Sequence, residues 1–265
     1  MEPSAELQKR PNHEKTFAFR VVEVLVIPFL NLIAKLDLHG TANLPVTGPF
    51  VLGPNHYSNF DPVIVAWSVW KLGRAPRFLA KASLFRIPVV GFGLRKIGQI
   101  PVERVTGGGR GNAPILAASD LVEHQGGVII YPEGTLTREP DLWPMRGKTG
   151  AARIALEQGV PLIPVAHWGT QAVLPRYSKK LSLFPRKRIQ IVFGPPIDLD
   201  DLRGHALDQK TLTEATDRLM TAITGLLEQL RGETAPAERW NPAQHNQSEF
   251  GRIDDGRKTS TKDTE

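Results

Sequence analysis

Short apolar runs alternate with amphipathic stretches over most of the chain, from Gly48 to Leu230. The short apolar runs predict strands at Phe50–Leu52, Arg77–Ala80, Gln99–Glu103, Gly127–Tyr131, Pro161–Ala166 and Arg188–Phe193. The stretches with apolar residues at helical spacing predict helices at Pro62–Leu72, Ala113–His124, Thr149–Gln158 and Thr211–Leu230. Alternation of this kind is typical of an α/β fold, so we expect a mostly parallel central sheet flanked by helices.

An apolar segment, Phe17–Leu38, predicts an amphipathic helical segment ahead of this α/β region. It contains charged residues such as Glu23 and Lys35, and Pro28 lies near its middle. A helix that spans a bilayer needs about 20 largely uncharged residues, which this segment does not offer. Two interpretations stay open: a kinked helix that lies at a membrane interface, or a helix that packs on the protein's own core. On the first, residues 1–38 form an N-terminal membrane-interface segment.

The last residues, 231–265, have few apolar side chains and predict a disordered polar tail, which leaves residues 39–230 as the main domain. The whole chain carries 33 basic and 27 acidic residues, a net charge of +6. Six of the basic and seven of the acidic residues lie in that tail, so the rest of the chain has an excess of 7 positive charges. Such an excess indicates an anionic partner: nucleic acid, a membrane surface or a phosphorylated substrate.

Cysteine is absent from the sequence. Its absence excludes disulfides, thiolate nucleophiles and metal or iron–sulfur sites held by cysteine. Two common signatures fail as well, because the Walker-like Gly147-Lys148-Thr149 has Leu142 in place of its leading glycine and no G-x-S-x-G elbow exists. The 7 histidines do not pair at metal-ligand spacing, so we expect no metal site.

A polar cluster, Asn55–Asp61, follows directly on the first predicted strand of the domain. Ligands of α/β proteins usually bind in loops beyond the carboxyl ends of strands. His56 and Asp61 are five positions apart and would lie on different faces of a regular helix, so they can meet only if the chain turns at Ser58-Asn59. An aspartate that accepts from one imidazole nitrogen leaves the other nitrogen as a base. Asp61 alone is also explained as a helix N-cap before a first-turn proline.

Two further polar clusters also come after predicted strands. Tyr131–Thr135 places Glu133 beside Gly134 at the end of a buried strand, where a charged side chain needs a partner. Arg104 follows another predicted strand, and arginine suits phosphate because its contacts are bidentate and its charge is permanent. Each residue alone has a structural explanation, but three clusters placed after strands indicate one site.

In their order along the chain, these clusters resemble the sequence boxes of the glycerolipid acyltransferases, typified by 1-acyl-sn-glycerol-3-phosphate acyltransferase (lysophosphatidic acid acyltransferase). The matching boxes are His56-x4-Asp61, Gly98–Arg104, Tyr131–Thr135 and Val160–Val165. Each box is modest by itself, whereas four in the right order are highly specific, and the resemblance extends over residues 40–197. Lys81 lies where relatives often have a basic residue ahead of the second box.

The chain departs from the family pattern at several positions. Tyr57 stands where arginine often follows the histidine, and Leu136 stands where arginine often follows E-G-T, with Arg138 two positions later. Pro101 and Glu103 replace the usual Phe and Asp of the second box. The histidine and aspartate are kept, so the departures concern the acceptor headgroup.

The resemblance implies an enzyme that transfers a fatty acyl group from acyl-CoA or acyl carrier protein to the hydroxyl of 1-acyl-sn-glycerol-3-phosphate, without a cofactor. The product would be phosphatidic acid for phospholipid synthesis. The resemblance also implies that His56 is the general base and that Asp61 orients it. An ionised Glu133 cannot bind phosphate directly, so we expect it to hold a basic residue in place. The acceptor-phosphate site would be shaped by Lys81, Arg104, Glu133, Gly134 and Thr135.

Residues 39–230 would then form the acyltransferase catalytic domain of a peripheral or monotopic protein at the cytoplasmic face of the cell membrane. The basic excess would serve substrate phosphates and anionic lipids, which leaves no need for nucleic acid. Without cysteine or a serine elbow, direct transfer is favoured over an acyl-enzyme. The alternatives are acylation of glycerol-3-phosphate or of another lysolipid or glycolipid, hydrolysis of the thioester, and a non-catalytic membrane-binding module.

Overall fold

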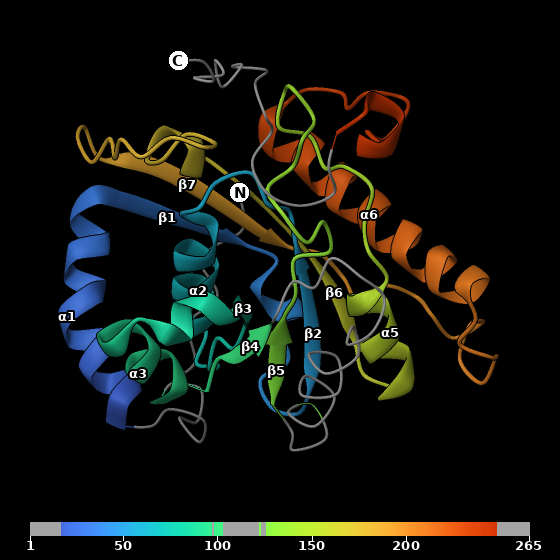
Figure 1. Cartoon of the computed structure of the whole chain (residues 1–265), viewed down its shortest axis with the longest axis horizontal. Helices are drawn as coiled ribbons and strands as arrows, with labels where there is room; N and C mark the ends of the chain where they lie inside the picture. The colour runs from blue at the N-terminus through green and yellow to red at the C-terminus, as the bar shows by residue number, and fades with distance from the viewer. Residues whose placement is uncertain (1–16, 97, 103–121, 123–125, 248–265) are drawn as a thin grey trace, which may run out of the picture.

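The five strands of the central sheet lie in the order β1-β7-β6-β2-β5 (Figure 1). The computed structural model describes residues 17–96, 98–102, 122 and 126–247. The strands of this sheet are β1 (Ala34–His39), β2 (Phe50–Pro54), β5 (Gly127–Ile129), β6 (Leu162–Trp168) and β7 (Lys187–Phe193). The helices are α1 (Phe17–Ile33), α2 (Asp61–Lys71), α3 (Pro88–Lys96), α5 (Gly150–Glu157) and α6 (Gln209–Arg231).

The predicted α/β fold with a mostly parallel sheet is confirmed. The pairs β1 with β7, β6 with β2, and β2 with β5 are parallel, whereas β6 and β7 run antiparallel. Parallel strands point their carboxyl ends to the same edge of a sheet, so the loops that follow β2, β5 and β6 lie next to one another.

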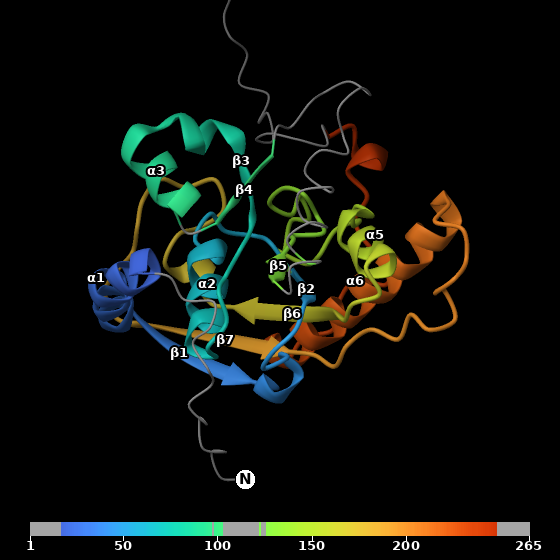
Figure 2. The same ribbon diagram turned by 90° about the horizontal axis from the view of Figure 1, so that it is seen from below.

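The hydrophobic core lies on both faces of the sheet, because neighbouring residues of a strand point to opposite faces. On one face, Val51 and Leu162 pack in the cluster of buried residues that α5 and α6 cover. On the other face, Leu52 and Ile163 pack with residues of α1 and α2. Figures 1 and 2 show the two pairs of helices on opposite sides of the sheet.

The N-terminal segment divides into a helix and a strand, which corrects the expectation of one helical segment over Phe17–Leu38. Residues Ala34–His39 form β1, which pairs with β7 at the edge of the sheet. In α1, Leu30 and Ile33 are buried against the core, whereas Phe29 and Leu32 are half or more exposed. The helix therefore packs on the protein through one face and presents apolar side chains on another.

None of the helices within residues 17–96, 98–102, 122 and 126–247 combines the length and the apolar character needed to cross a bilayer.

Two of the predicted strands form a small separate sheet instead of joining the central one. β3 (Leu79–Lys81) pairs in parallel with β4 (Ile100–Val102), and a bridge between Phe78 and Ile129 connects this sheet to β5. The 3-10 helix η2 (Ala82–Arg86) and α3 fill the connection between the two strands. The helix predicted at Ala113–His124 lies outside the described residues except for Val122.

The predicted polar tail is partly packed on the domain, which corrects the expectation of disorder for residues 231–247. Ala235 N–H donates to Glu228 of α6 (2.8 Å), and the Trp240 carbonyl accepts from Arg146 N–H (2.8 Å). The Arg231 guanidinium lies over the rings of Trp143 and Trp168, at 3.9 and 4.4 Å from their centroids. These contacts could not be read from composition, because they join backbone groups and an arginine of the segment to other parts of the chain. Residues 248–265 lie outside the described range.

We expect Gly127→Ala to lower the free energy of unfolding, because a Cβ there would lie 2.1 Å from Cζ of buried Phe50, its partner across the β2–β5 pair. Overpacking of this kind costs about 1–3 kcal/mol. Gly225→Ala in α6 is the matched control, since its Cβ would meet nothing within 4 Å and should stabilise the helix by about 0.5–1 kcal/mol. Urea denaturation measures the free energy of unfolding of both variants. An unchanged midpoint for Gly127→Ala would show that β2 and β5 can move apart enough to accommodate the Cβ.

Candidate active site

Three loops meet where the parallel strands β2, β5 and β6 end. The loop after β2 carries His56, the loop after β5 carries Glu133, and the 3-10 helix η3 (Thr170–Ala172) comes just after β6. The first two loops hold the polar clusters that the sequence predicts as one site. The third carries Thr170, which sequence reasoning did not identify.

His56 and Asp61 form the predicted pair. The distance from His56 Nδ1 to the Asp61 Oδ2 atom is 3.0 Å, and the histidine side chain is 14% exposed whereas the aspartate is fully buried. The chain turns between them as expected, because Asp61 N–H donates to the carbonyl of Ser58 (3.1 Å). Asp61 begins α2 ahead of Pro62, and the N-cap is Phe60, so Asp61 is not the helix cap.

The Asp61 carboxylate collects donors from both of its oxygens. Its Oδ2 accepts from the backbone N–H groups of Tyr57 and Ser58, both at 2.7 Å, and its Oδ1 accepts from the Thr170 hydroxyl at 2.6 Å. Burial by itself would raise the pKa of Asp61, but nearby His167, His56 and these hydrogen bonds hold it below the ordinary value. Asp61 is therefore an anion that fixes the His56 ring with Nδ1 toward itself.

A buried histidine on β6, His167, contacts the loop that follows β2. Its Nε2 lies 2.9 Å from the carbonyl of Asn55, its Nδ1 lies 3.2 Å from the Tyr57 hydroxyl, and Nδ1 is 3.9 Å from Asp61 Oδ1. Asn55 exchanges two further hydrogen bonds with the backbone of His167, at 2.9 and 3.2 Å. Burial lowers the pKa of His167, although the nearby Asp61 carboxylate acts in the opposite direction.

Sequence reasoning missed His167 and Thr170. One signal could have pointed to His167: a polar, ionisable residue inside an otherwise apolar strand is buried and needs partners. Thr170 carries no such signal, because a threonine in a loop is ordinary. Tyr57, noted only as a departure from the family pattern, is a buried partner of His167.

Glu133 holds the backbone of His56, and among the described residues it forms no ion pair with a basic side chain, which differs from the expectation. Its Oε1 accepts from His56 N–H (2.8 Å) and its Oε2 accepts from Met145 N–H (3.2 Å). On the other side of His56, the carbonyl accepts from Thr137 N–H at 2.6 Å. The segment after β5 thus clamps the histidine backbone at two points. Burial raises the pKa of Glu133 to about 8.

His56 faces a cleft of about 450 Å³, called here the His56 cleft. Its ring stacks on Tyr131, with ring centroids 4.1 Å apart. No hydrogen bond joins the Nε2 atom of His56 to another of the described residues, so this nitrogen is available to a ligand. Most of the lining is apolar. Besides His56, the lining consists of Pro62, Phe78, Leu79, Leu84, Leu94, Gln99, Ile130, Tyr131, Pro132, Gly134, Lys148, Gly150 and Ala151.

A second, almost wholly apolar pocket of about 300 Å³ adjoins the cleft between α1, α2 and α3. The two cavities share the lining residues Pro62, Phe78, Leu94 and Gln99. Trp67 and Trp70 of α2 are buried and line this pocket. A substrate with a hydrocarbon chain could therefore extend from His56 into apolar surroundings.

The remaining predicted site residues have different outcomes. Gly134 lines the His56 cleft with φ +71°, a conformation that favours glycine, whereas Thr135 is buried. Lys81 is the last residue of β3. Arg104 lies outside the described residues.

The fold and the site together define an α/β protein whose paired histidine and aspartate face a largely apolar cleft. The sequence model of the family described as Acyltransferase matches residues 35–168, just over half of the chain; this range includes the loops that carry His56 and Glu133 and ends with β6, ahead of η3. The chain belongs to the Acyltransferase family.

Curated relatives agree with this assignment. A chloroplastic 1-acyl-sn-glycerol-3-phosphate acyltransferase of Brassica napus is 29% identical over 67% of this chain and 52% of its own. The 1-acyl-sn-glycerol-3-phosphate acyltransferase of Bacillus subtilis is 29% identical over 76% of this chain and 94% of its own. The chain spans about half the length of the plant relatives that it matches.

Among solved structures, the 1-acyl-sn-glycerophosphate acyltransferase PlsC of Thermotoga maritima shares the fold, with a TM-score of 0.62 and 22% identity. The match covers 82% of this chain and 81% of that chain.

We expect the stability contributed by Glu133 to fall as pH rises from about 4.5, its ordinary pKa, to about 8, its pKa in the folded protein. In this interval the unfolded chain loses the proton and the folded chain keeps it, so the free energy of unfolding falls by up to 1.4 kcal/mol per pH unit, roughly. Glu133→Gln should remove this slope and leave a constant loss of about 0.5–1.5 kcal/mol for the missing acceptor. Urea unfolding at several pH values compares the two; parallel curves would contradict a protonated Glu133.

Proposed function

We propose that this protein transfers a fatty acyl group from a thioester to the hydroxyl of 1-acyl-sn-glycerol-3-phosphate. The observation that carries the proposal is the His56–Asp61 pair, with Nδ1 held at 3.0 Å and Nε2 in the apolar cleft. Family membership and the names of the relatives support the same reaction.

In this proposal, His56 Nε2 removes the proton of the acceptor hydroxyl as the oxygen attacks the thioester carbonyl carbon. The imidazolium that forms is stabilised by the Asp61 carboxylate, whose lowered pKa keeps it charged. When the tetrahedral intermediate collapses, the carbon–sulfur bond breaks and the imidazolium returns its proton to the leaving thiolate. The reaction yields an ester and a free thiol, and no acyl-enzyme is required.

The clamp on the His56 backbone gives this base a fixed position. Glu133 and Thr137 hold its N–H and carbonyl, and Tyr131 limits the rotation of its ring. Positioning of this kind lowers the entropic cost of bringing the base and the acceptor hydroxyl together in the transition state. The cleft and the pocket beside α1 offer apolar volume for the acyl chains of the donor and the acceptor.

The donor is acyl-CoA or acyl carrier protein in this proposal, and the acceptor binds as a lysophospholipid. Acylation of glycerol-3-phosphate or of another lysolipid is the alternative, because Leu136 stands where relatives often have arginine. An assay with labelled donor against a panel of acceptors separates these substrates. Release of free fatty acid without acceptor would instead identify a hydrolase.

The proposal places the protein at the cytoplasmic face of the cell membrane, where its substrates are. The exposed apolar side chains of α1, together with those of the segment from η2 to α3, support attachment to a lipid surface. These exposed side chains are Val24, Phe29, Leu32, Leu84, Ile87, Val90 and Phe92.

We expect His56→Ala to lower kcat/KM by about 10²–10⁴-fold, because general acid–base catalysis contributes about that much. Asp61→Asn should also lower it, since the pair would lose the charge that stabilises the imidazolium. His205→Ala, at an exposed histidine of the loop before α6, is the matched control and should keep wild-type turnover. Acyl transfer is followed with labelled donor and circular dichroism checks folding; a folded His56→Ala protein with normal transfer would refute the base assignment.

We expect substitution of Val24, Phe29 and Leu32 by serine to weaken binding to anionic liposomes, because these side chains are exposed on α1. Deletion of residues 1–38 is a poorer test, since it also removes most of β1 from the sheet. Val46→Ser, at an exposed valine of the loop before β2, should bind as the wild type does. Sedimentation with vesicles measures the bound fraction; equal binding by the triple variant would exclude α1 as the attachment surface.

A further inference from the structure

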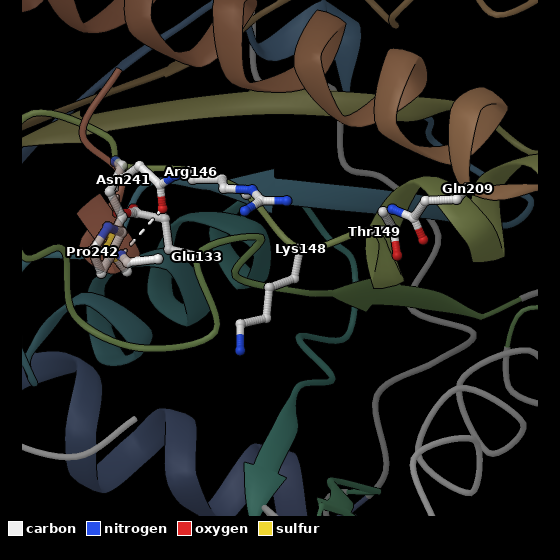
Figure 3. A pocket seen from close by; sticks show the side chains of 10 residues that line it. Glu133, Arg146, Lys148, Thr149, Gln209, Asn241 and Pro242 are labelled. Atoms are coloured by element: carbon white, nitrogen blue, oxygen red, sulfur yellow. Dashed lines mark hydrogen bonds between the residues drawn. The ribbon is translucent and has the colours of Figure 1, made fainter. Parts of the chain in front are cut away.

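A polar pocket of about 240 Å³, whose lining residues are drawn in Figure 3, adjoins the His56 cleft and shares the lining residue Lys148 with it. In Figure 3, Arg146 and Lys148 lie between Glu133 and Asn241 on one side and Thr149 and Gln209 on the other. The pocket is smaller than the roughly 300–1,000 Å³ typical of sites for whole drug-sized ligands. Its size suits a single headgroup.

The lining of the polar pocket is basic. Arg146 and Lys148 contribute two cations, and Glu133 is the only acid among the ten described residues that line the pocket. Burial raises the pKa of that glutamic acid to about 8, so it carries little negative charge at neutral pH. Within the described part of the chain, no hydrogen bond or ion pair engages the exposed Arg146 guanidinium, although its backbone N–H is bonded to Trp240.

Neutral donors complete the lining. Thr149 and Gln209 stand at the first turns of α5 and α6, and the Gln209 amide reaches the Thr213 hydroxyl at 3.0 Å. Asn241 comes from the packed part of the predicted tail, so the pocket is complete only when that segment lies on the domain. Cationic and amide donors around a small cavity are the chemistry that binds an oxyanion.

The polar pocket is connected to the reacting centre through two residues. Lys148 lines both the pocket and the His56 cleft, and its side chain lies against Gly134, where a Cβ would be 3.2 Å from Lys148 Cδ. Glu133 lines the pocket and accepts from the His56 N–H (2.8 Å). A phosphate in the pocket would therefore be a short distance from a hydroxyl or thioester at His56.

We propose that the polar pocket binds a phosphate group of a substrate that reacts at His56, with Arg146 and Lys148 as its cationic ligands. This inference rests on the proposed acyl transfer and adds to it the place of a phosphate. The phosphate belongs either to the acceptor headgroup or to the thioester donor, since both carry the same chemistry. Arg138, the nearest arginine after the Tyr131–Thr135 box, is 1% exposed and lines neither the pocket nor the cleft, so it does not take this role.

The test compares Arg146→Gln with the wild type on matched substrates that do and do not carry phosphate. The acceptor arm uses 1-acyl-sn-glycerol-3-phosphate against monoacylglycerol. The donor arm uses acyl-CoA against the acyl thioester of N-acetylcysteamine. We expect KM to rise about tenfold for the phosphate-bearing member of one pair, because a charge-assisted hydrogen bond is lost, and to stay unchanged for its phosphate-free partner.

The arm that responds identifies the source of the phosphate. Arg153→Gln is the control: this arginine lies on α5, pairs with Glu157 at 3.8 Å and is not part of the pocket lining. Its KM values should equal those of the wild type. Unchanged KM for both phosphate-bearing substrates in Arg146→Gln, or an equal rise for the phosphate-free ones, would overturn the phosphate site.

A binding measurement separates this inference from the proposed reaction. Phosphorus NMR titration of the full chain with glycerol 3-phosphate and with inorganic phosphate gives affinities without turnover. Binding that weakens about tenfold in Arg146→Gln and persists in Arg153→Gln supports the pocket, even if the wild type transfers no acyl group. Binding equal in all three proteins would refute the pocket, even if acyl transfer is intact.

Discussion

The buried carboxylate of Asp61 is the interaction on which the site depends. It takes hydrogen bonds from two backbone N–H groups of its own loop, from Thr170 after β6 and from His56. A buried charge is stable only when donors surround it, so the carboxylate imposes the shape of the loop after β2. The same donors keep Asp61 ionised, which is the state that orients His56 and stabilises its protonated ring.

The sheet supplies the frame for this carboxylate. Because β2 is parallel to both β5 and β6, the loops after all three strands reach one edge, where Glu133 and Thr137 clamp the His56 backbone. His167 of β6 is hydrogen-bonded to Asn55 and Tyr57, and these contacts attach the loop after β2 to β6. The reactive side chain is thus positioned by buried neighbours from three elements, and only its outer nitrogen is left for chemistry.

The surroundings of His56 differ on its two sides. Toward α1, α2 and α3 the cavities are apolar, whereas toward Arg146 and Lys148 the lining is cationic. This division matches an amphipathic ligand that has a hydrocarbon chain at one end and an anion at the other. Part of the excess positive charge of the chain is therefore located beside the site, where Arg146 and Lys148 lie.

The sequence by itself determined the α/β class, the order of the boxes and the His56–Asp61 pair, because strand periodicity and the turn between the two residues are local properties. It could not assign the Glu133 contact with His56, which joins residues 77 positions apart, or the contacts of His167 with Asn55 across 112 positions. For the same reason the sequence predicted β1 as part of a helix, because β1 forms a strand by pairing with the distant β7. The packing of the tail segment that contributes Asn241 also depends on distant residues. Only the tertiary structure decides such contacts, since burial and strand pairing, unlike helical periodicity, depend on residues far away in the chain.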